Sequence, residues 1–234
     1  MADGLLSLSP VIPVVVLDDA ADAVPLAGAL LDGGVPVMEI TLRTPAALAS
    51  IAAVADAVPA MTVGAGTLTT PSEVGDAVAA GARFLVSPGS PARLVDAMLA
   101  TGLPALPGVA TATEALALLD RGVTAMKFFP AGPAGGPRYL AALAGPLPQV
   151  RFCPTGGIGP GDVEVYLSLP NVACVGGSWL APRDVVRRRD WAEVSARCAA
   201  LRGRGGVSGD TPPAGRPRRP RTHLADAAAP ARRV

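Results

Sequence analysis

Histidine and lysine are nearly absent from the sequence. Among 234 residues the only histidine is His223, and among the 20 basic residues Lys127 is the only lysine. A single histidine near the C-terminal end excludes histidine-based catalytic triads and histidine-rich metal sites. Catalysis therefore has to rest on Lys, Asp, Glu, Arg, Ser, Thr or backbone dipoles.

Aromatic residues are also scarce, and no hydrophobic stretch is long. Aromatics make up 3% of the chain while hydrophobic residues make up 50%, so the core has to consist mainly of Ala, Val, Leu and Ile. Such a core suits a layered α/β protein better than an aromatic-rich β-sandwich. No apolar run approaches the roughly 20 residues of a membrane span, and the first residues lack the basic region of a signal peptide. We therefore expect a cytoplasmic protein without membrane contact.

Cysteine occurs three times, as Cys153, Cys174 and Cys198. The number is odd, and the first two lie in strand-like runs without the spacing of metal ligands. We predict buried free thiols in a reducing cytosol, and no metal site.

Positive charge is concentrated at the C-terminal end. Residues 203–234 contain seven Arg and two Asp, a net charge of +5, and because the whole chain carries +1 the other 202 residues carry −4. The stretch is rich in Pro, Gly and Ala and cannot bury a core, so it is predicted to be a disordered tail. Binding of nucleic acid or of an anionic surface is one interpretation. An inert tail is favoured, because no aromatic residues accompany the arginines for base stacking.

Strand-like and helical patterns alternate along the rest of the chain. Runs typical of buried parallel strands lie at 11–17, 37–42, 61–66, 84–87, 104–107, 125–129, 150–154 and 172–176. A helical pattern follows each run, at 20–32, 45–57, 71–80, 91–101, 112–121, 137–144, 160–168 and 182–201. Eight such units predict an α/β fold, a (β/α)8 TIM barrel, built as a single domain by residues 1–202. A doubly wound sheet is the second interpretation.

The single lysine lies inside one of the strand-like runs, at the centre of Thr124-Ala-Met-Lys-Phe-Phe-Pro-Ala131. Arginine keeps its proton near neutral pH, whereas a desolvated lysine can lose it and attack a carbonyl carbon as a neutral amine. One lysine in a chain that otherwise uses arginine therefore indicates a nucleophile. The alternative is a lysine that ends a strand and points into water.

Polar residues collect where the predicted strands end, which is where barrels of this kind hold their active sites. Alternate strand residues share a face, so Glu39, Thr41 and Arg43 lie together on the second strand. The same parity puts Thr67 at the end of the third strand and Phe129 beside Lys127 on the sixth. It puts Thr155 and Ser178 at the ends of the last two strands.

Glu39 and Arg43 each allow a functional and a structural interpretation. A carboxylate on a central strand is unusual, and Glu39 is a candidate general acid and base. A structural ion pair with Arg43 or Arg151 is the alternative. Arg43 has the fork of donors that clamps a carboxylate or phosphate, but it is also explained as a solvated loop arginine.

Two glycine-rich turns follow the last two strands. They read Thr155-Gly-Gly-Ile-Gly159 and Gly176-Gly-Ser178. In barrels these two loops commonly bind phosphate through backbone N–H groups, and glycine lets the backbone approach the anion. The alternative is that tight turns need glycine in any case.

These residues together resemble the bacterial 2-keto-3-deoxy-6-phosphogluconate (KDPG) and 4-hydroxy-2-oxoglutarate (KHG) aldolases, a family of class I aldolases. The resemblance covers residues 10–182. The matching stretches are 34–44 (GVPVMEITLRT), 63–67 (VGAGT), 87–89 (SPG), 107–108 (PG), 127–130 (KFFP), 145–146 (GP), 150–158 (VRFCPTGGI) and 176–180 (GGSWL).

The resemblance implies a lyase of carbohydrate metabolism, in the Entner–Doudoroff pathway, that uses no metal or cofactor. It implies a homotrimer acting on a phosphorylated 2-keto-3-deoxy sugar acid. Lys127 would form the Schiff base and Glu39 would move protons, while Arg43 and Thr67 would hold the pyruvate carboxylate. Residues expected to line the pocket are Phe129, Pro88 and Thr155, and those expected to bind phosphate are Gly156, Gly157, Gly177 and Ser178.

One position departs from the family pattern. Some members carry a basic residue near the end of the first strand that faces the phosphate, and here that place reads Leu17-Asp18-Asp19. Weaker phosphate selectivity is expected, which keeps 4-hydroxy-2-oxoglutarate open as a substrate beside KDPG and its galactonate epimer.

Two other functions compete with an aldolase. Another phosphate-binding barrel enzyme, an isomerase or synthase, would share the glycine turns but would not need Lys127 as a nucleophile. A non-enzymatic module would instead bind nucleic acid or a partner through the arginine-rich tail.

Overall fold

A computed structural model describes residues 2–201 of the chain. Residues 203–234, predicted to form a disordered tail, lie outside the described residues. Within residues 2–201 strands and helices alternate largely as expected, and all strand pairs are parallel. The predicted α/β class with a parallel sheet is therefore confirmed.

The strands form two curled parallel sheets. The larger has the order β5-β4-β3-β2-β1-β9 and the smaller the order β6-β7-β8. In the larger sheet the strands span Val11–Val15 (β1), Val37–Thr41 (β2), Thr62–Gly66 (β3), Leu85–Val86 (β4), Ala105–Leu106 (β5) and Val175–Gly177 (β9). In the smaller sheet they span Gly108–Val109 (β6), Ala125–Phe128 (β7) and Arg151–Pro154 (β8).

The two sheets approach each other at both of their edges. On one side β5 and β6 are consecutive and are separated by Pro107, whose carbonyl accepts the N–H of Lys127 at 3.0 Å. On the other side single parallel bridges join Phe152 to Val172 and Thr155 to Gly176. The prediction of one strand at 104–107 is wrong in its bounds. Pro107 has no N–H for the ladder, and the following N–H, of Gly108, is directed to the Ser87 hydroxyl at 3.4 Å.

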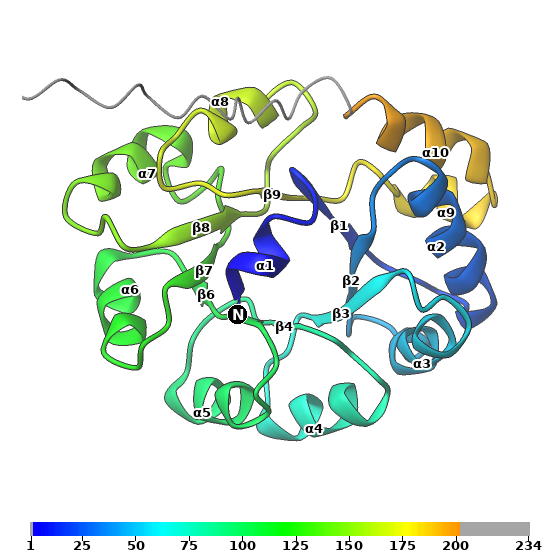
Figure 1. Cartoon of the computed structure of the whole chain (residues 1–234), viewed down its shortest axis with the longest axis horizontal. Coiled ribbons are helices and arrows are strands. Elements are labelled where there is room, and N and C mark those ends of the chain that lie inside the picture. The colour runs from blue at the N-terminus through cyan, green and yellow to red at the C-terminus, as the bar shows by residue number, and fades with distance from the viewer. Residues whose placement is uncertain (1, 202–234) are drawn as a thin grey trace, which may run out of the picture.

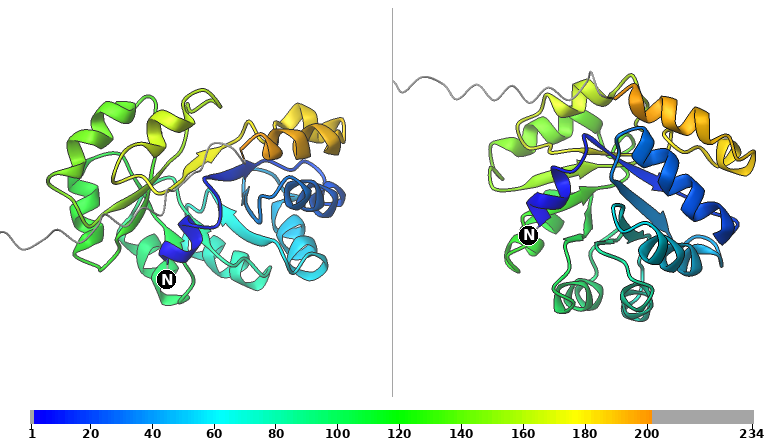
Figure 2. Two further views of the ribbon diagram at one scale, coloured as in Figure 1. Left: turned by 45° about the horizontal axis from the view of Figure 1, so that its top comes forward. Right: turned by 45° about the vertical axis from the view of Figure 1, so that its right-hand side comes forward.

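Helices surround the strands in Figures 1 and 2. Along the chain every strand is followed by at least one helix, as the sequence predicts, except β5, which is followed directly by β6. The helices span Ala2–Leu6 (α1), Ala23–Asp32 (α2), Ala47–Ala57 (α3), Pro71–Ala79 (α4), Ala92–Ala100 (α5), Ala112–Leu119 (α6), Gly136–Ala144 (α7), Val163–Leu167 (α8), Arg183–Arg187 (α9) and Trp191–Ala199 (α10), with a short 3-10 turn at Ala20–Asp22 (η1).

Two helical expectations need correction. The single helix predicted at 182–201 is divided into α9 and α10, because Arg189 takes a left-handed backbone with φ of 57° and the Asp190 carboxylate caps the new helix at the Glu193 N–H. The leader before the first strand contains α1, which the sequence did not predict. Its residues Leu5 and Leu6 are buried.

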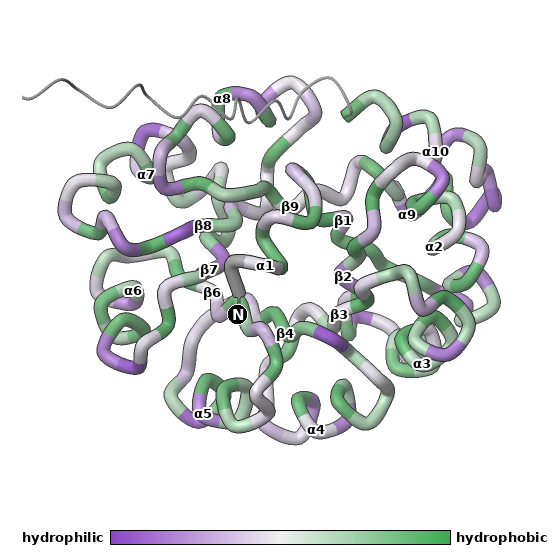
Figure 3. Tube along the Cα trace, in the orientation of Figure 1, coloured by the Kyte–Doolittle hydropathy of each residue, from purple (hydrophilic) through white to green (hydrophobic). Residues whose placement is uncertain are grey.

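Small aliphatic residues build most of the core, as the composition predicts. Helices show hydrophobic and hydrophilic segments in alternation along the tube of Figure 3, which is the pattern of helices with one buried face. The few aromatics are placed centrally, and Phe84, Phe128 and Phe152 are fully buried. Phe128 contacts Phe152 edge to face, with ring centroids 6.1 Å apart.

The cysteines are free and buried, as predicted. A hydrogen bond to Cys153 and burial raise the pKa of Cys174 well above its ordinary range, so that its thiol stays protonated at neutral pH. Burial also raises the pKa of Cys198, to about 11. Among the helices of residues 2–201, none is both long and apolar enough to cross a membrane.

Candidate active site

A buried ion pair joins Lys127 to Glu39. Lys127 lies on β7 of the smaller sheet and Glu39 on β2 of the larger, and Lys127 Nζ is 3.2 Å from Glu39 Oε1. Their side chains are only 5% and 4% exposed. The alternative in which Lys127 points into water is therefore wrong. The alternative partners of Glu39 are also not used, because Arg43 donates to Thr67 Oγ1 and the exposed Arg151 donates to the Pro170 carbonyl at 2.9 Å.

Gly66 makes room for the Glu39 carboxylate, a role that the sequence did not reveal. Gly66 is paired with Thr41 in the register of β2 and β3, beside the strand that carries Glu39. A Cβ at position 66 would lie 2.0 Å from Glu39 Oε1, which is far inside van der Waals contact. Glycine was expected at this strand end only as part of the family pattern, and its contact with Glu39 depends on side-chain placement across two strands.

Two predicted pocket residues lie beside Lys127. Its Nζ is 5.3 Å from the centre of the Phe129 ring. The ring in turn packs against Gly156, where a Cβ would come within 3.1 Å of it. Pro88 lies close to Gly108, which pairs with Lys127 in the strand register. A Cβ on Gly108 would lie only 2.4 Å from the Pro88 backbone. Phe129 thus lies next to the amine, and Pro88 lies against β6, the strand paired with the one that carries Lys127.

Arg43 and Thr67 are brought together at the ends of β2 and β3. Arg43 Nε donates to Thr67 Oγ1 at 3.2 Å. Arg43 is exposed, yet it is anchored by this bond, so it is not simply a solvated loop residue. Thr67 has a φ of 62°, which is uncommon for a residue with a branched side chain. Thr41, by contrast, is buried and its hydroxyl donates to the Val15 carbonyl at 2.9 Å, so it ties β2 to β1.

The two glycine-rich turns lie next to each other. A parallel bridge pairs Thr155 with Gly176, and a Cβ on Gly176 would meet Thr155 Oγ1 at 2.2 Å. Gly156 and Gly157 have φ of 95° and 75°, a conformation that favours glycine. Gly157 and Ser178 are exposed where the turns leave the strands. Both turns therefore have a residue at the surface that is accessible to a ligand.

Asp18, the position that departs from the family pattern, is bound by two arginines. Arg183 holds it through Nε at 2.9 Å and through a second contact from Nη2 to Oδ1, and Arg187 Nε donates to it at 2.8 Å. The hydrogen bonds from Arg183 and Arg187 hold the pKa of this carboxyl far below its usual range. These pairs join residues 165 and 169 positions apart, so no local pattern in the chain indicates them.

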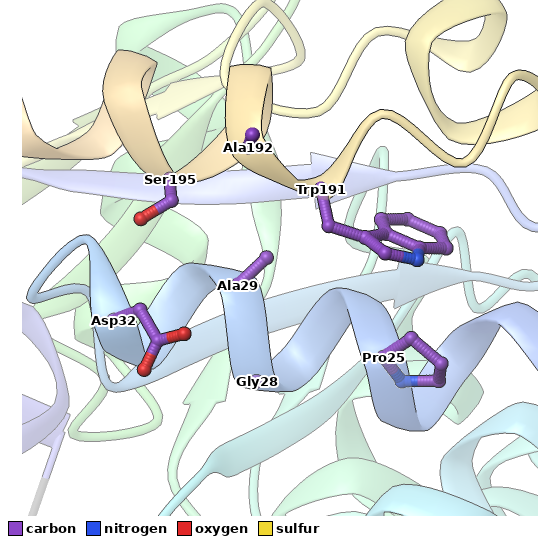
Figure 4. Close-up of a pocket in the computed structure, with 7 residues that line it drawn as sticks. All are labelled: Pro25, Gly28, Ala29, Asp32, Trp191, Ala192 and Ser195. Carbon is purple, nitrogen blue, oxygen red and sulfur yellow. The ribbon is translucent and has the colours of Figure 1, made fainter.

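No group of three or more His, Cys, Asp or Glu side chains within residues 2–201 is arranged to hold a metal ion. A surface hollow does exist between α2 and α10, shown in Figure 4. Its lining contains none of the residues predicted for the site, and its only titratable side chain is that of Asp32. The hollow is separate from the Lys127–Glu39 pair and has no candidate catalytic groups.

The fold and the buried pair define a class of protein, namely a parallel α/β protein with a buried lysine next to a carboxylate, two groups that can in principle supply a nucleophile and an acid or base. The family model for KDPG and KHG aldolases matches residues 3–197. The chain belongs to the KDPG and KHG aldolase family.

Relatives of known activity agree with this assignment. The chain is 48% identical over 191 residues to the 2-dehydro-3-deoxy-phosphogluconate aldolase of Pseudoalteromonas atlantica, covering 82% of this chain and 89% of that protein. It is 44% identical over 194 residues to the KHG/KDPG aldolase of Escherichia coli K12, covering 83% and 91%. A crystal structure of KDPG aldolase from Legionella pneumophila, with pyruvate captured as a covalent carbinolamine, matches at 45% identity with a TM-score of 0.84, covering 86% of this chain and 98% of that one.

Proposed function

We propose that the protein is a class I aldolase. It cleaves 2-keto-3-deoxy-6-phosphogluconate to pyruvate and glyceraldehyde 3-phosphate, and 4-hydroxy-2-oxoglutarate to pyruvate and glyoxylate. The observation that carries the proposal is the buried contact of 3.2 Å between Lys127 Nζ and Glu39 Oε1. A family whose members include an aldolase trapped with pyruvate as a carbinolamine supports the same chemistry.

Lys127 is the nucleophile in the proposed mechanism. Transfer of a proton along its hydrogen bond to Glu39 neutralises both groups and leaves the amine with a free electron pair. The amine adds to the C2 ketone and forms a carbinolamine. Glu39 then returns a proton to the C2 hydroxyl, which leaves as water, and a protonated imine remains on Lys127.

Cleavage follows because the iminium accepts electrons. Glu39, again a carboxylate, takes the proton of the C4 hydroxyl, and the electrons of the C3–C4 bond move toward the iminium nitrogen. The aldehyde departs and a pyruvate enamine remains. Protonation of C3 and addition of water to the resulting imine release pyruvate and restore Lys127 and Glu39.

The remaining predicted residues hold the two ends of the substrate. Arg43 and Thr67, already joined by a bond of 3.2 Å, bind the carboxylate next to C2. Phe129, Pro88 and Thr155 line the pocket around the amine. The turns that contain Gly156, Gly157, Gly177 and Ser178 receive the phosphate through backbone N–H groups and the serine hydroxyl.

The full architecture is part of the proposal. Bridges from β8 toward β9 and the near-continuity of β5 and β6 support a closed eight-stranded (β/α)8 barrel, in which β5 and β6 are two halves of one strand. We further propose a cytoplasmic homotrimer. The support for that assembly is the family resemblance alone.

A substrate panel assayed by pyruvate release tests the proposal. The panel contains KDPG, its galactonate epimer and 4-hydroxy-2-oxoglutarate, each with the wild-type enzyme and with Lys127→Arg. We expect turnover of KDPG and of 4-hydroxy-2-oxoglutarate by the wild type and none by the variant. A phosphate-binding isomerase or synthase would release no pyruvate, and its activity would survive the substitution.

A further inference from the structure

The segments that follow β1 and β9 leave the sheet at the same edge. The two strands are paired in parallel, with Pro13 opposite Gly177. Asp18 follows β1 by three residues, and the Gly177-Ser178 turn of the proposed phosphate site continues from β9 into α9, which begins at Arg183. Contact between Asp18 and Arg183 shows that the two segments stay together beyond the sheet. The inference below rests on the proposed function.

A carboxylate in this place would by itself repel a phosphate dianion. Asp18 is not alone, however, because Arg183 and Arg187 both bind it. The three groups carry a net charge of +1 at neutral pH, since the hydrogen bonds from the arginines hold the pKa of Asp18 far below its usual range and keep it ionised. Asp18 therefore aligns two guanidinium groups and leaves one of their two positive charges uncompensated.

The guanidinium groups also retain capacity for a ligand. Within residues 2–201 their hydrogen bonds to protein engage Nε and Nη2 of Arg183 and Nε of Arg187. The other Nη groups make no hydrogen bond to a described residue. Both arginine side chains are about half exposed, at 49% and 60%. Guanidinium groups that a carboxylate binds on one side can present their remaining N–H donors to the oxygens of a phosphate ester.

Neighbouring acidic residues do not cancel this charge, because they have arginines of their own. Arg189 binds Asp22 at 2.7 Å and Asp19 at 3.4 Å. Arg188 binds Asp184 at 2.8 Å on the adjoining turn of α9. The excess positive charge therefore stays with the Asp18 cluster, defined here as Asp18, Arg183 and Arg187.

We propose that Arg183 and Arg187, aligned by Asp18, form the cationic end of the substrate site and set a preference for substrates that end in a phosphate. The basic group that some relatives carry at the end of the first strand is thus supplied from α9, on the other side of the phosphate-binding turn. Under this proposal the enzyme keeps a preference for phosphorylated substrates, in contrast to the weaker phosphate selectivity expected from the sequence.

The test compares two substrates that differ only in the phosphate, KDPG and 2-keto-3-deoxygluconate, in the wild type and in Arg183→Ala/Arg187→Ala. We expect kcat/KM for KDPG to fall about tenfold in the variant through a higher KM, as for the loss of a charge-assisted contact. Turnover of 4-hydroxy-2-oxoglutarate and of the unphosphorylated sugar acid stays within about twofold. Inorganic phosphate, used as a competitive inhibitor of 4-hydroxy-2-oxoglutarate cleavage, loses affinity by a similar factor.

Arg188→Ala is the matched control, because it removes an arginine from the same segment whose ion pairs within residues 2–201 are with Asp184 and Glu193 and not with Asp18. Single variants at Arg183 and Arg187 show the same effect in smaller steps if the double variant does not fold. An unchanged ratio between phosphorylated and unphosphorylated substrates would overturn the proposal while leaving the aldolase intact. A wild type that releases no pyruvate from any of these substrates overturns the proposed function instead, and this inference with it.

Discussion

Lys127 and Glu39 illustrate how a site can be stable only as a unit. Each side chain is nearly inaccessible to water, and each compensates the charge of the other at 3.2 Å. Breaking a buried pair by neutralising one partner leaves an uncompensated charge, which costs several kcal/mol in measured cases. The same exchangeable proton that joins the two groups is the one that the proposed mechanism moves.

Replacement of Glu39 by glutamine tests this dual role. The amide keeps the shape and can still accept a hydrogen bond from Lys127, but it cannot take a proton. We expect kcat for pyruvate release to fall by about 100- to 10,000-fold, the usual contribution of a general acid and base, with a lower melting temperature. Glu164→Gln, at an exposed position of α8, is the control and should change neither. Near-normal kcat in Glu39→Gln would remove Glu39 from the mechanism.

Gly66→Ala probes the space that the carboxylate needs. An added Cβ would lie 2.0 Å from Glu39 Oε1, so the carboxylate has to move away from Lys127. We expect kcat to fall by about tenfold or more while the fold is retained at some cost in stability. Gly75→Ala in α4 is the control, since a Cβ there meets nothing within 4 Å and alanine favours a helix. Equal kcat in both variants would show that the position of Glu39 is not critical.

At the scale of elements, two helices begin with the same device. Thr70 and Thr111 accept the N–H groups of Glu73 and Glu114 three residues on, and each glutamate reaches back to the N–H of its threonine. Capping boxes of this kind satisfy donors that a helix start leaves unpaired. The sequences Thr-Pro-Ser-Glu and Thr-Ala-Thr-Glu encode these caps locally, and the helical patterns predicted at 71–80 and 112–121 begin at the same residues as α4 and α6.

Removal of one cap should weaken the fold without affecting catalysis. Thr111→Ala loses the bond to the Glu114 N–H, and we expect the free energy of unfolding to fall by about 1 kcal/mol. Denaturant titration measures the loss. Thr113→Ala, inside the same helix, is the control and should cost little. A change in kcat/KM with Thr111→Ala would mean that α6 takes part in the active site.

Glu73 makes the stability of α4 depend on pH. Burial raises its pKa, but hydrogen bonds from Thr69 and Thr70 outweigh burial, so the folded-state pKa is lower than the ordinary value. Its contribution is therefore complete above the unfolded-state pKa of about 4.3 and is lost as the pH falls through the lower folded value. We expect the difference in melting temperature between wild type and Glu73→Gln to shrink as the pH is lowered from 6 toward about 3. A constant difference across this range would contradict the assignment.

At the scale of the whole molecule, alternation of apolar strands and amphipathic helices was readable from the sequence because each unit carries its own period and stop signals. Strand lengths were less readable. The strand boundaries around Pro107 depend on which group accepts the Gly108 N–H, and that is decided by a tertiary contact with Ser87. The division of 182–201 depended on one left-handed residue, Arg189.

The candidate site shows the same division between local and distant information. Strand parity was sufficient to bring Lys127, Glu39, Arg43 and Thr67 to one end of the fold. It could not reveal that Gly66 makes space for a carboxylate, or that arginines more than 160 residues away form ion pairs with Asp18. Such contacts are set by how strands and loops meet in space, and no periodicity in the chain encodes them.

Covalent trapping tests the central claim, that Lys127 is the nucleophile, most directly. The enzyme is incubated with pyruvate, reduced with borohydride and digested, and the peptide that contains Lys127 is examined by mass spectrometry. We predict one irreversible adduct per chain, with the mass of a reduced pyruvate imine, on Lys127, and none in Lys127→Arg. Because Lys127 is the only lysine, no other side-chain amine competes for the label. A fully active enzyme without this adduct, or full activity in Lys127→Arg, would contradict the account.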